Sequence, residues 1–150
     1  MRKKIRIFER EFSRHHDELW QLVAETSDPV LFRKPVENPA FLSFGELALR
    51  SAGRVEQTFG GLTSRLWDDP FEWTLPEELS GGEKILEYFK EVEATRDRGF
   101  RFLRSDDDLL REIPSPEKIR TIFEILLETI IEARKYEQRA RLTRDLMIKN

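Results

Sequence analysis

The chain contains no cysteine among its 150 residues. Without thiols it can form no disulfide, no thiolate metal site and no cysteine nucleophile, a composition compatible with a reducing cytoplasm. No apolar run approaches the ~20 residues that a membrane-spanning helix needs. The basic N-terminus is interrupted at residues 8–12, before any apolar segment develops, so we expect no signal peptide. These absences predict a cytoplasmic protein without a membrane partner.

Histidine is scarce as well, because the chain has only the adjacent pair His15 and His16. Neighbouring side chains on a helix diverge by ~100°, so the two imidazoles cannot easily bind one ion. Catalytic zinc needs about three histidine or carboxylate ligands. A ferritin-type di-iron site needs Glu-x-x-His on two helices, but Phe12 and Ser13 occupy the glutamate positions here. We therefore expect no metal and no cofactor.

Motifs of other functional classes are missing too. The sequence shows no glycine-rich phosphate loop, no Ser-His-Asp set and no nucleic-acid-binding motif. Its net charge of −3 provides no global field that would attract nucleic acid. Basic residues gather near both ends of the chain, and we interpret them as solvated helix faces. We expect no nucleic-acid partner.

What the chain does have is charge combined with apolar residues at helical spacing. Hydrophobic residues make up 39% and charged residues 37% of the sequence, which is typical of an amphipathic helical protein. Apolar positions recur every three or four residues in the segments 5–26, 43–66, 80–103 and 115–147. No strand pattern competes with them. The sequence predicts an all-α protein in which residues 1–150 form a single four-helix-bundle domain.

Several residues predict where these helices begin. Ser43 and Ser80 are each followed three residues later by a glutamate, which is the signature of a capping box. Ser115 is placed to cap the last helix, and Pro116 to open it. Residues 67–76 (WDDPFEWTLP) set aromatic side chains between turn residues, and we expect this loop to fold back onto the end of the bundle.

The last helix is predicted to organise the core, and its apolar stripe is unusually wide. Leu127 and Ile131 extend the stripe beyond its centre, beside an acidic row of Glu124, Glu128 and Glu132. The central positions are Ile119, Ile122, Phe123, Leu126, Ile130, Ala133 and Ala140. We expect a homodimer that covers the apolar edge and brings the acidic row near basic residues of the partner chain. The alternative is that the aromatic loop covers this edge within one chain.

Four residues are candidates for a ligand pocket. His15 and His16 flank the apolar stripe of the first helix, as acid-base or ligand-contacting groups or as boundary histidines bonded to Glu11 or Glu18. Arg50 and Arg54 lie one turn apart on the second helix and would suit a carboxylate or phosphate. The alternative is that these arginines pair with acids of a facing helix, for example Glu91 or Glu128.

Several segments together resemble the DinB-like (YfiT-like) four-helix-bundle superfamily. Residues 43–53 (SFGELALRSAG) resemble the family's second helix, where a glutamate and apolar residues precede a metal-binding histidine. The loop 69–76 (DPFEWTLP) and the third helix through Phe89, Val92, Glu93 and Arg96 are similar too. Residues 132–138 (EARKYEQ) resemble the family's last-helix His-Glu-x-x-His motif followed by a glutamine. The resemblance implies a dimeric bundle related to metal-dependent thiol transferases or isomerases.

The departures from the family pattern determine the expected function. The positions that match the three metal-binding histidines are Arg50, Ile131 and Lys135, and no histidine lies beyond His16. A cation there can replace part of a metal's charge but cannot offer an open coordination site. We therefore expect a metal-free, DinB-like protein that binds a small ligand or a protein partner. The alternatives are a divergent transferase- or isomerase-like enzyme using Arg50 and a histidine of the first helix, and a purely structural or interaction protein.

Overall fold

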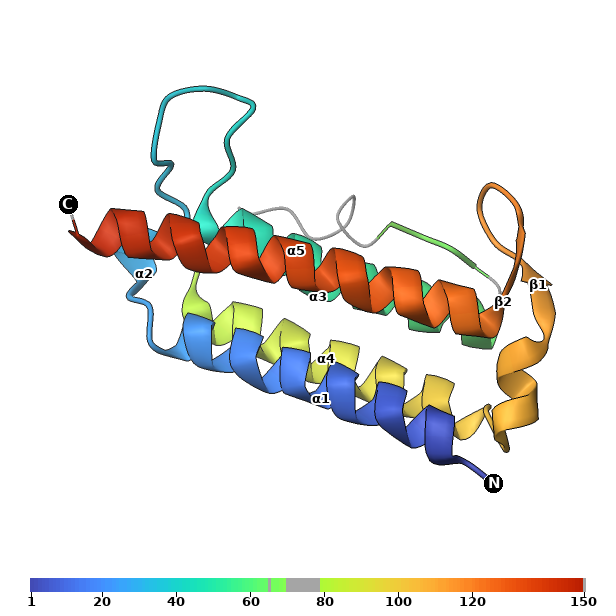
Figure 1. Cartoon of the computed structure of the whole chain (residues 1–150). Helices are drawn as coiled ribbons and strands as arrows, with labels where there is room; N and C mark the ends of the chain where they lie inside the picture. Colours follow the sequence, from blue (N-terminus) through green and yellow to red (C-terminus); the bar gives the residue numbers. More distant parts are fainter. Residues whose placement is uncertain (65, 70–78, 150) are drawn as a thin grey trace.

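A computed structural model of the chain describes residues 1–64, 66–69 and 79–149, and it is mostly helical (Figure 1). The long helices are α1 (Lys3–Ala24), α3 (Phe44–Ser64), α4 (Gly82–Arg101) and α5 (Ile122–Lys149). Between them lie the short helix α2 (Asp28–Leu31), a 3-10 helix η2 (Asp106–Leu110), and the strands β1 (Glu112–Pro114) and β2 (Ile119–Thr121). The prediction of a mostly helical chain with four long helices is confirmed.

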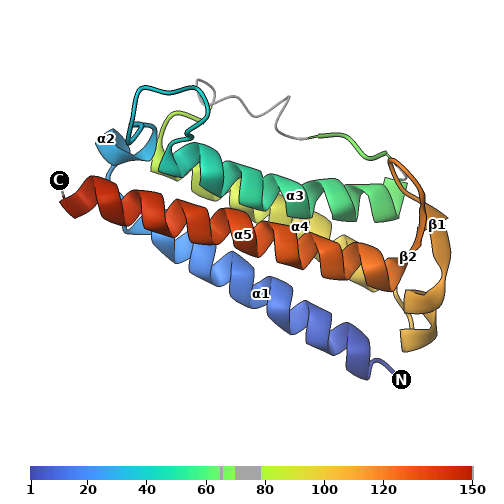
Figure 2. The same ribbon diagram turned by 45° about the horizontal axis from the view of Figure 1, so that its top comes forward.

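The four long helices lie side by side, and long-range contacts show their directions (Figures 1 and 2). In the α3–α5 pair, Ser51 bonds Ala133 and Thr58 bonds Thr129, so these helices are antiparallel. In the α3–α4 pair, Glu56 bonds Thr95, and Phe59 lies against Gly99. Helices α3 and α4 therefore run in the same direction, although they follow each other in the sequence. None of the helices in the described part of the chain is long and apolar enough to cross a bilayer.

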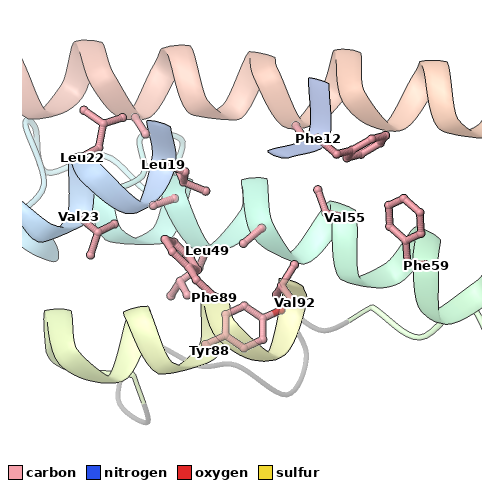
Figure 3. Close-up of a cluster of buried hydrophobic side chains, with 14 of the residues drawn as sticks. Phe12, Leu19, Leu22, Val23, Leu49, Val55, Phe59, Tyr88, Phe89 and Val92 are labelled. Atoms are coloured by element: carbon pink, nitrogen blue, oxygen red, sulfur yellow. The ribbon is translucent and has the colours of Figure 1, made fainter. Parts of the chain in front are cut away.

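The core is formed by apolar faces at helical spacing. All six apolar positions predicted for the first helix are buried: Ile5, Phe8, Phe12, Leu19, Leu22 and Val23. Figure 3 shows side chains of α1, α3 and α4 converging in the layer between these helices. The rings of Phe12, Phe59 and Phe100 form an aromatic cluster with centroid distances of 4.9–5.9 Å, the range of attractive ring pairs. Gly99 admits the Phe59 ring, because a Cβ there would lie 2.4 Å from Phe59 Cδ1.

Two helix starts show where local capping signals suffice and where they do not. Before α3, Ser43 Oγ accepts from the backbone N–H of Glu46, and Glu46 accepts in return from the backbone of Ser43. The predicted capping box at Ser43 is thus confirmed. The one predicted at Ser80 is wrong, because Gly81 occupies the N-cap of α4 and makes no side-chain cap bond. Instead, Asp28 of α2 accepts from the backbone N–H of Gly82.

The predicted start of the last helix at Ser115 is also wrong, as is the expectation that no strand forms. Residues 112–121 form an antiparallel hairpin in which Ile113 pairs with Arg120, and Ser115 lies in its turn. Pro116 opens no helix but is exposed in that turn. Helix α5 begins at Ile122, capped by Thr121, whose hydroxyl accepts from the backbone N–H of Glu124. Pro114 and Pro116 flank Ser115, and proline and serine are residues that favour turns.

The apolar stripe of α5 is partly as predicted and partly displaced. Ile122, Leu126, Ala133 and Ala140 are buried. Ile119 is exposed on β2, and Phe123 is 37% exposed and rests edge-on against Phe8. Ile125, which the predicted stripe omits, is fully buried. The buried face of α5 is therefore rotated slightly about the helix axis relative to the predicted face. Leu127 and Ile131 are 43% and 47% exposed, beside the buried face.

The predicted aromatic loop lies mostly outside the described residues, which exclude 70–78. Of its first part, Trp67 lies over Gly61, where a Cβ would be 2.3 Å from the indole ring. Leu66, the last residue of the predicted second helix, is 62% exposed because α3 ends at Ser64.

Candidate functional site

A large cavity in the described part of the chain is the cleft between α3, the hairpin turn and α5. Its volume is about 640 Å³, within the ~300–1,000 Å³ usual for small-ligand sites. Arg50 and Arg54 of α3 line one wall, and Ile131 and Lys135 of α5 line the other. We call it the Arg50 cleft. The structure thus brings Arg50, Ile131 and Lys135, which are distant in sequence, to one cavity.

Two arginines at this cleft are held by glutamates of α5. Arg54 pairs with Glu132, and Arg120 of β2 pairs with Glu128. The predicted pairing with an acid of a facing helix is thus confirmed for Arg54, although the partner is Glu132 and not Glu91 or Glu128. Arg54 also donates to Thr58 Oγ1 at 2.7 Å, and Thr58 lies 2.6 Å from the buried Thr129 of α5. These bonds orient both guanidiniums along the cleft wall and neutralise much of their charge.

The remaining charges of the cleft favour an anion. Its described lining residues include five basic side chains (Arg50, Arg54, Lys118, Arg120, Lys135) and four acidic ones (Asp69, Glu117, Glu128, Glu132). Within the described chain, neither Lys118 at the hairpin turn nor Lys135 on α5 has a carboxylate partner at ion-pair distance. Both ammonium groups therefore remain available for a ligand that carries a carboxylate or phosphate.

The histidines do not line this cleft. His15 is 3% exposed, and its Nε2 lies 2.6 Å from Ser51 Oγ. Ser51 donates its only hydroxyl proton to the carbonyl of Ala133, also at 2.6 Å, so His15 Nε2 must carry a proton and donate to Ser51. The predicted bond to Glu11 or Glu18 is thus wrong. Burial lowers the pKa of His15 to about 3, assisted by the nearby charge of Arg134, so the ring is neutral near pH 7.

Glu137 is the second buried ionisable group in this layer. Its side chain is fully buried, with Oε1 4.0 Å from His15 Nε2 and 2.8 Å from Arg134. Arg141 approaches the other oxygen at 3.6 Å. Burial raises the pKa of Glu137, and the charge of Arg134 opposes that shift. Because the Ser51 and Glu137 contacts both use Nε2 of His15, the three residues do not form a nucleophile-activating triad, which needs both ring nitrogens.

His16 points to the other side of α1 and lies 3.2 Å from Glu93 of α4. Burial lowers its pKa, and Arg96 adds to the shift. Both histidines line a cavity of about 10 Å³, which is too small for an organic ligand. Arg50 and the histidines are therefore not brought together at one site.

Sequence reasoning missed several lining residues of the cleft. Lys118 and Arg120 were assigned to a helix that does not exist there, so the hairpin wall could not be foreseen. The burial of Glu137, which lies outside the cleft, was also missed. Its helical spacing from Ala133 and Ala140, both on the apolar stripe, is the signal that could have predicted it.

In the described residues, no three histidine, cysteine, aspartate or glutamate side chains gather as a metal-binding group. In comparisons with protein-family models, with curated proteins and with solved structures, nothing matched this chain.

Proposed function

We propose that the protein is a DinB/YfiT-like four-helix bundle that binds a small anionic ligand in the Arg50 cleft without the family's metal. The observation that carries the proposal is the convergence of Arg50, Ile131 and Lys135 on one cleft. These are the positions that the sequence resemblance matches to the three metal-binding histidines. A shared cavity is what the resemblance requires of them.

The side chains in these positions support binding rather than metal chemistry. Guanidinium and ammonium groups are poor metal ligands, whereas both recognise carboxylate and phosphate oxygens. Arg50 presents a planar set of donors, and Lys135 adds a point charge from the opposite wall. Ile131, one turn before Lys135 on α5, contributes apolar contact. The set suits an organic anion and offers no group that would activate a thiol nucleophile.

The test is calorimetric titration with inorganic phosphate and with succinate at low ionic strength. We expect Arg50→Met and Lys135→Met each to weaken binding by about 10- to 100-fold, because each removes hydrogen bonds to a charged group worth ~1.5–3 kcal/mol. Lys84→Met is the matched control, since Lys84 is an exposed lysine of α4 that lines none of the cavities described above. Equal affinities of all four proteins, or no binding by the unmodified chain, would overturn the proposal.

We also propose a homodimer formed along α5. Phe123 and Leu127 are 37% and 43% exposed and lie four residues apart, which places them on one edge of the helix. A second copy of the chain would cover this edge through a two-fold contact. The acidic row does not need partner arginines, because Glu128 and Glu132 already pair with Arg120 and Arg54 of their own chain. The proposed contact is therefore mainly apolar.

A further inference from the structure

A second cavity adjoins the Arg50 cleft and differs from it in chemistry. It has a volume of about 350 Å³ and lies where α3 and α4 end and the hairpin begins. Leu62, Trp67, Phe102 and Ile113 are among its lining residues, and Arg111 is the only charged one in the described chain. We call it the Trp67 pocket. Phe102 borders this pocket and is 57% exposed.

The two cavities are neighbours along one face of α3. Gln57 lines the Arg50 cleft, and Gly61, one helical turn later, lines the Trp67 pocket. Pro116 of the hairpin turn lines both cavities. Gln57 donates a hydrogen bond to the carbonyl of Trp67 at 3.2 Å, and the indole lies over Gly61. Pro116 therefore lies where the two cavities approach each other.

We propose that the ligand is an amphipathic anion that occupies both cavities. Its carboxylate or phosphate group binds between Arg50 and Lys135, and its apolar tail extends past Pro116 into the Trp67 pocket. This inference rests on the proposed function, because the head group uses the same cleft. The difference in charge supports this assignment. Within the described chain, lysines without a carboxylate partner line the cleft, whereas the pocket is lined mainly by apolar residues and has Arg111 as its one charged side chain. An alkyl chain buried there gains by leaving water.

The test is a chain-length series measured by calorimetry, with butyrate, hexanoate, octanoate and decanoate and with the alkyl phosphates of the same lengths. Once the tail is long enough to reach the pocket, each added methylene is expected to tighten binding about three- to fourfold until the pocket is filled, after which the affinity levels off. The two head groups show which anion the cleft prefers. Octanol has the tail without the charge, and it is expected to bind at least about tenfold more weakly than octanoate.

Variants separate the head from the tail. Phe102→Ser is expected to reduce the gain per methylene while leaving the affinity for butyrate unchanged. Leu110→Ser is its control, because Leu110 is equally apolar, 68% exposed and lines neither cavity. Lys135→Gln is expected to weaken all chain lengths by the same factor. Arg111→Gln is expected to weaken binding of all chain lengths much less than Lys135→Gln does, since the head group lies in the cleft and not in the pocket.

A spectroscopic readout keeps the test independent of the stability of these variants. In the unmodified chain, octanoate is expected to shift the indole N–H resonance of Trp67, assigned with Trp67→Phe, whereas butyrate is not. Anion binding that is independent of chain length would overturn the amphipathic ligand and leave the proposed function standing. A loss caused by Arg111→Gln and not by Lys135→Gln would also overturn it. Failure of every anion to bind would instead overturn the proposed function itself.

Discussion

Asp28 accepts a hydrogen bond from the backbone N–H of Gly82, with Oδ1 and the nitrogen 3.1 Å apart. This carboxylate lies in the first turn of α2 but provides the side-chain cap of α4, 54 residues later. The first amides of a helix have no partner within the helix, so a cap from another element stabilises both the helix and the contact between the elements. The same strategy recurs at α1, where Asp106 of η2 accepts from the amides of Lys4 and Ile5.

Loss of the α4 cap gives the first prediction. Asp28→Ala is expected to lower the free energy of unfolding by about 1 kcal/mol, the usual effect of removing a cap side chain. Ser80→Ala is the matched control and is expected to have little effect, because Ser80 is exposed and Gly81 holds the N-cap position. Urea denaturation of the three proteins measures both values. The reverse order would mean that the local serine caps α4 after all.

Two glycines allow a test of packing in the core. Gly99→Ala is expected to destabilise by about 1–3 kcal/mol, because its Cβ would meet the Phe59 ring at 2.4 Å in a closely packed cluster. At Gly53 the nearest atom to a new Cβ is Tyr88 Oη at 3.8 Å. Gly53→Ala is therefore expected to be neutral or to stabilise by up to ~1 kcal/mol through helix propensity. Thermal unfolding that ranks the variants the other way would contradict the α3–α4 packing.

Adjacent leucines on α5 test which face is buried. Leu126 is fully buried and Leu127 is 43% exposed. Leu126→Ala is expected to cost about 2–5 kcal/mol, the range for large-to-small changes in a core. Leu127→Ala is expected to cost clearly less, and Phe123→Ala to fall between them, because Phe123 is partly exposed but contacts Phe8. Denaturant titrations in dilute protein provide the comparison, and equal losses at positions 126 and 127 would refute this orientation of the helix.

The buried histidine predicts a specific pH dependence. The pKa of His15 is about 3 in the folded chain and near 6.5 in the unfolded chain. Between these two pH values the imidazole is protonated in the unfolded state and neutral in the folded state. Stability from this group is fully present above pH 6.5 and is lost as the pH falls, by up to about 1.4 kcal/mol per pH unit. Glu137 acts in the opposite direction, because its raised pKa lets the folded state take up a proton first.

The measurement is a difference that isolates His15 from the other groups. His15→Gln keeps a donor for Ser51 but cannot titrate. Between pH 7 and pH 5 the free energy of unfolding is expected to fall more steeply with decreasing pH in the unmodified protein than in this variant. The facing charges of Glu18, Arg96, Arg134 and Glu137 are present in both proteins and largely cancel. Parallel pH profiles would show that His15 is protonated with a normal pKa in the folded state.

The proposed homodimer is tested by light scattering across micromolar concentrations. The expected mass is twice the 17.9 kDa of one chain. Leu127→Glu is expected to shift the protein to a monomer, because it places a charge in the apolar contact. Leu110→Glu, at an exposed leucine of η2 outside this edge, is the control. A mass of one chain at all concentrations would rule the dimer out.

The periodicity of the sequence was sufficient to identify the four long helices and much of their buried faces. The apolar positions of α1 and the capping box Ser43–Glu46 depend on residues within a few positions of each other. Helix formation and first-turn capping are local, so their signals are readable along the chain. The resemblance-based choice of Arg50, Ile131 and Lys135 also came from the sequence, whereas their meeting at one cleft is a property of the fold.

Only the tertiary structure decided the features that join distant segments. The hairpin at residues 112–121 replaces a predicted helix start because its strands pair with each other and its end bonds Arg111 to Ile122. His15 acquires Ser51 and Glu137 as neighbours from two other helices, and no sequence spacing encodes that contact. The direction of α4 relative to α3 places Gly82 beside Asp28. Such contacts depend on how helices pack against one another, which is determined by the whole core and not by any single stretch of residues.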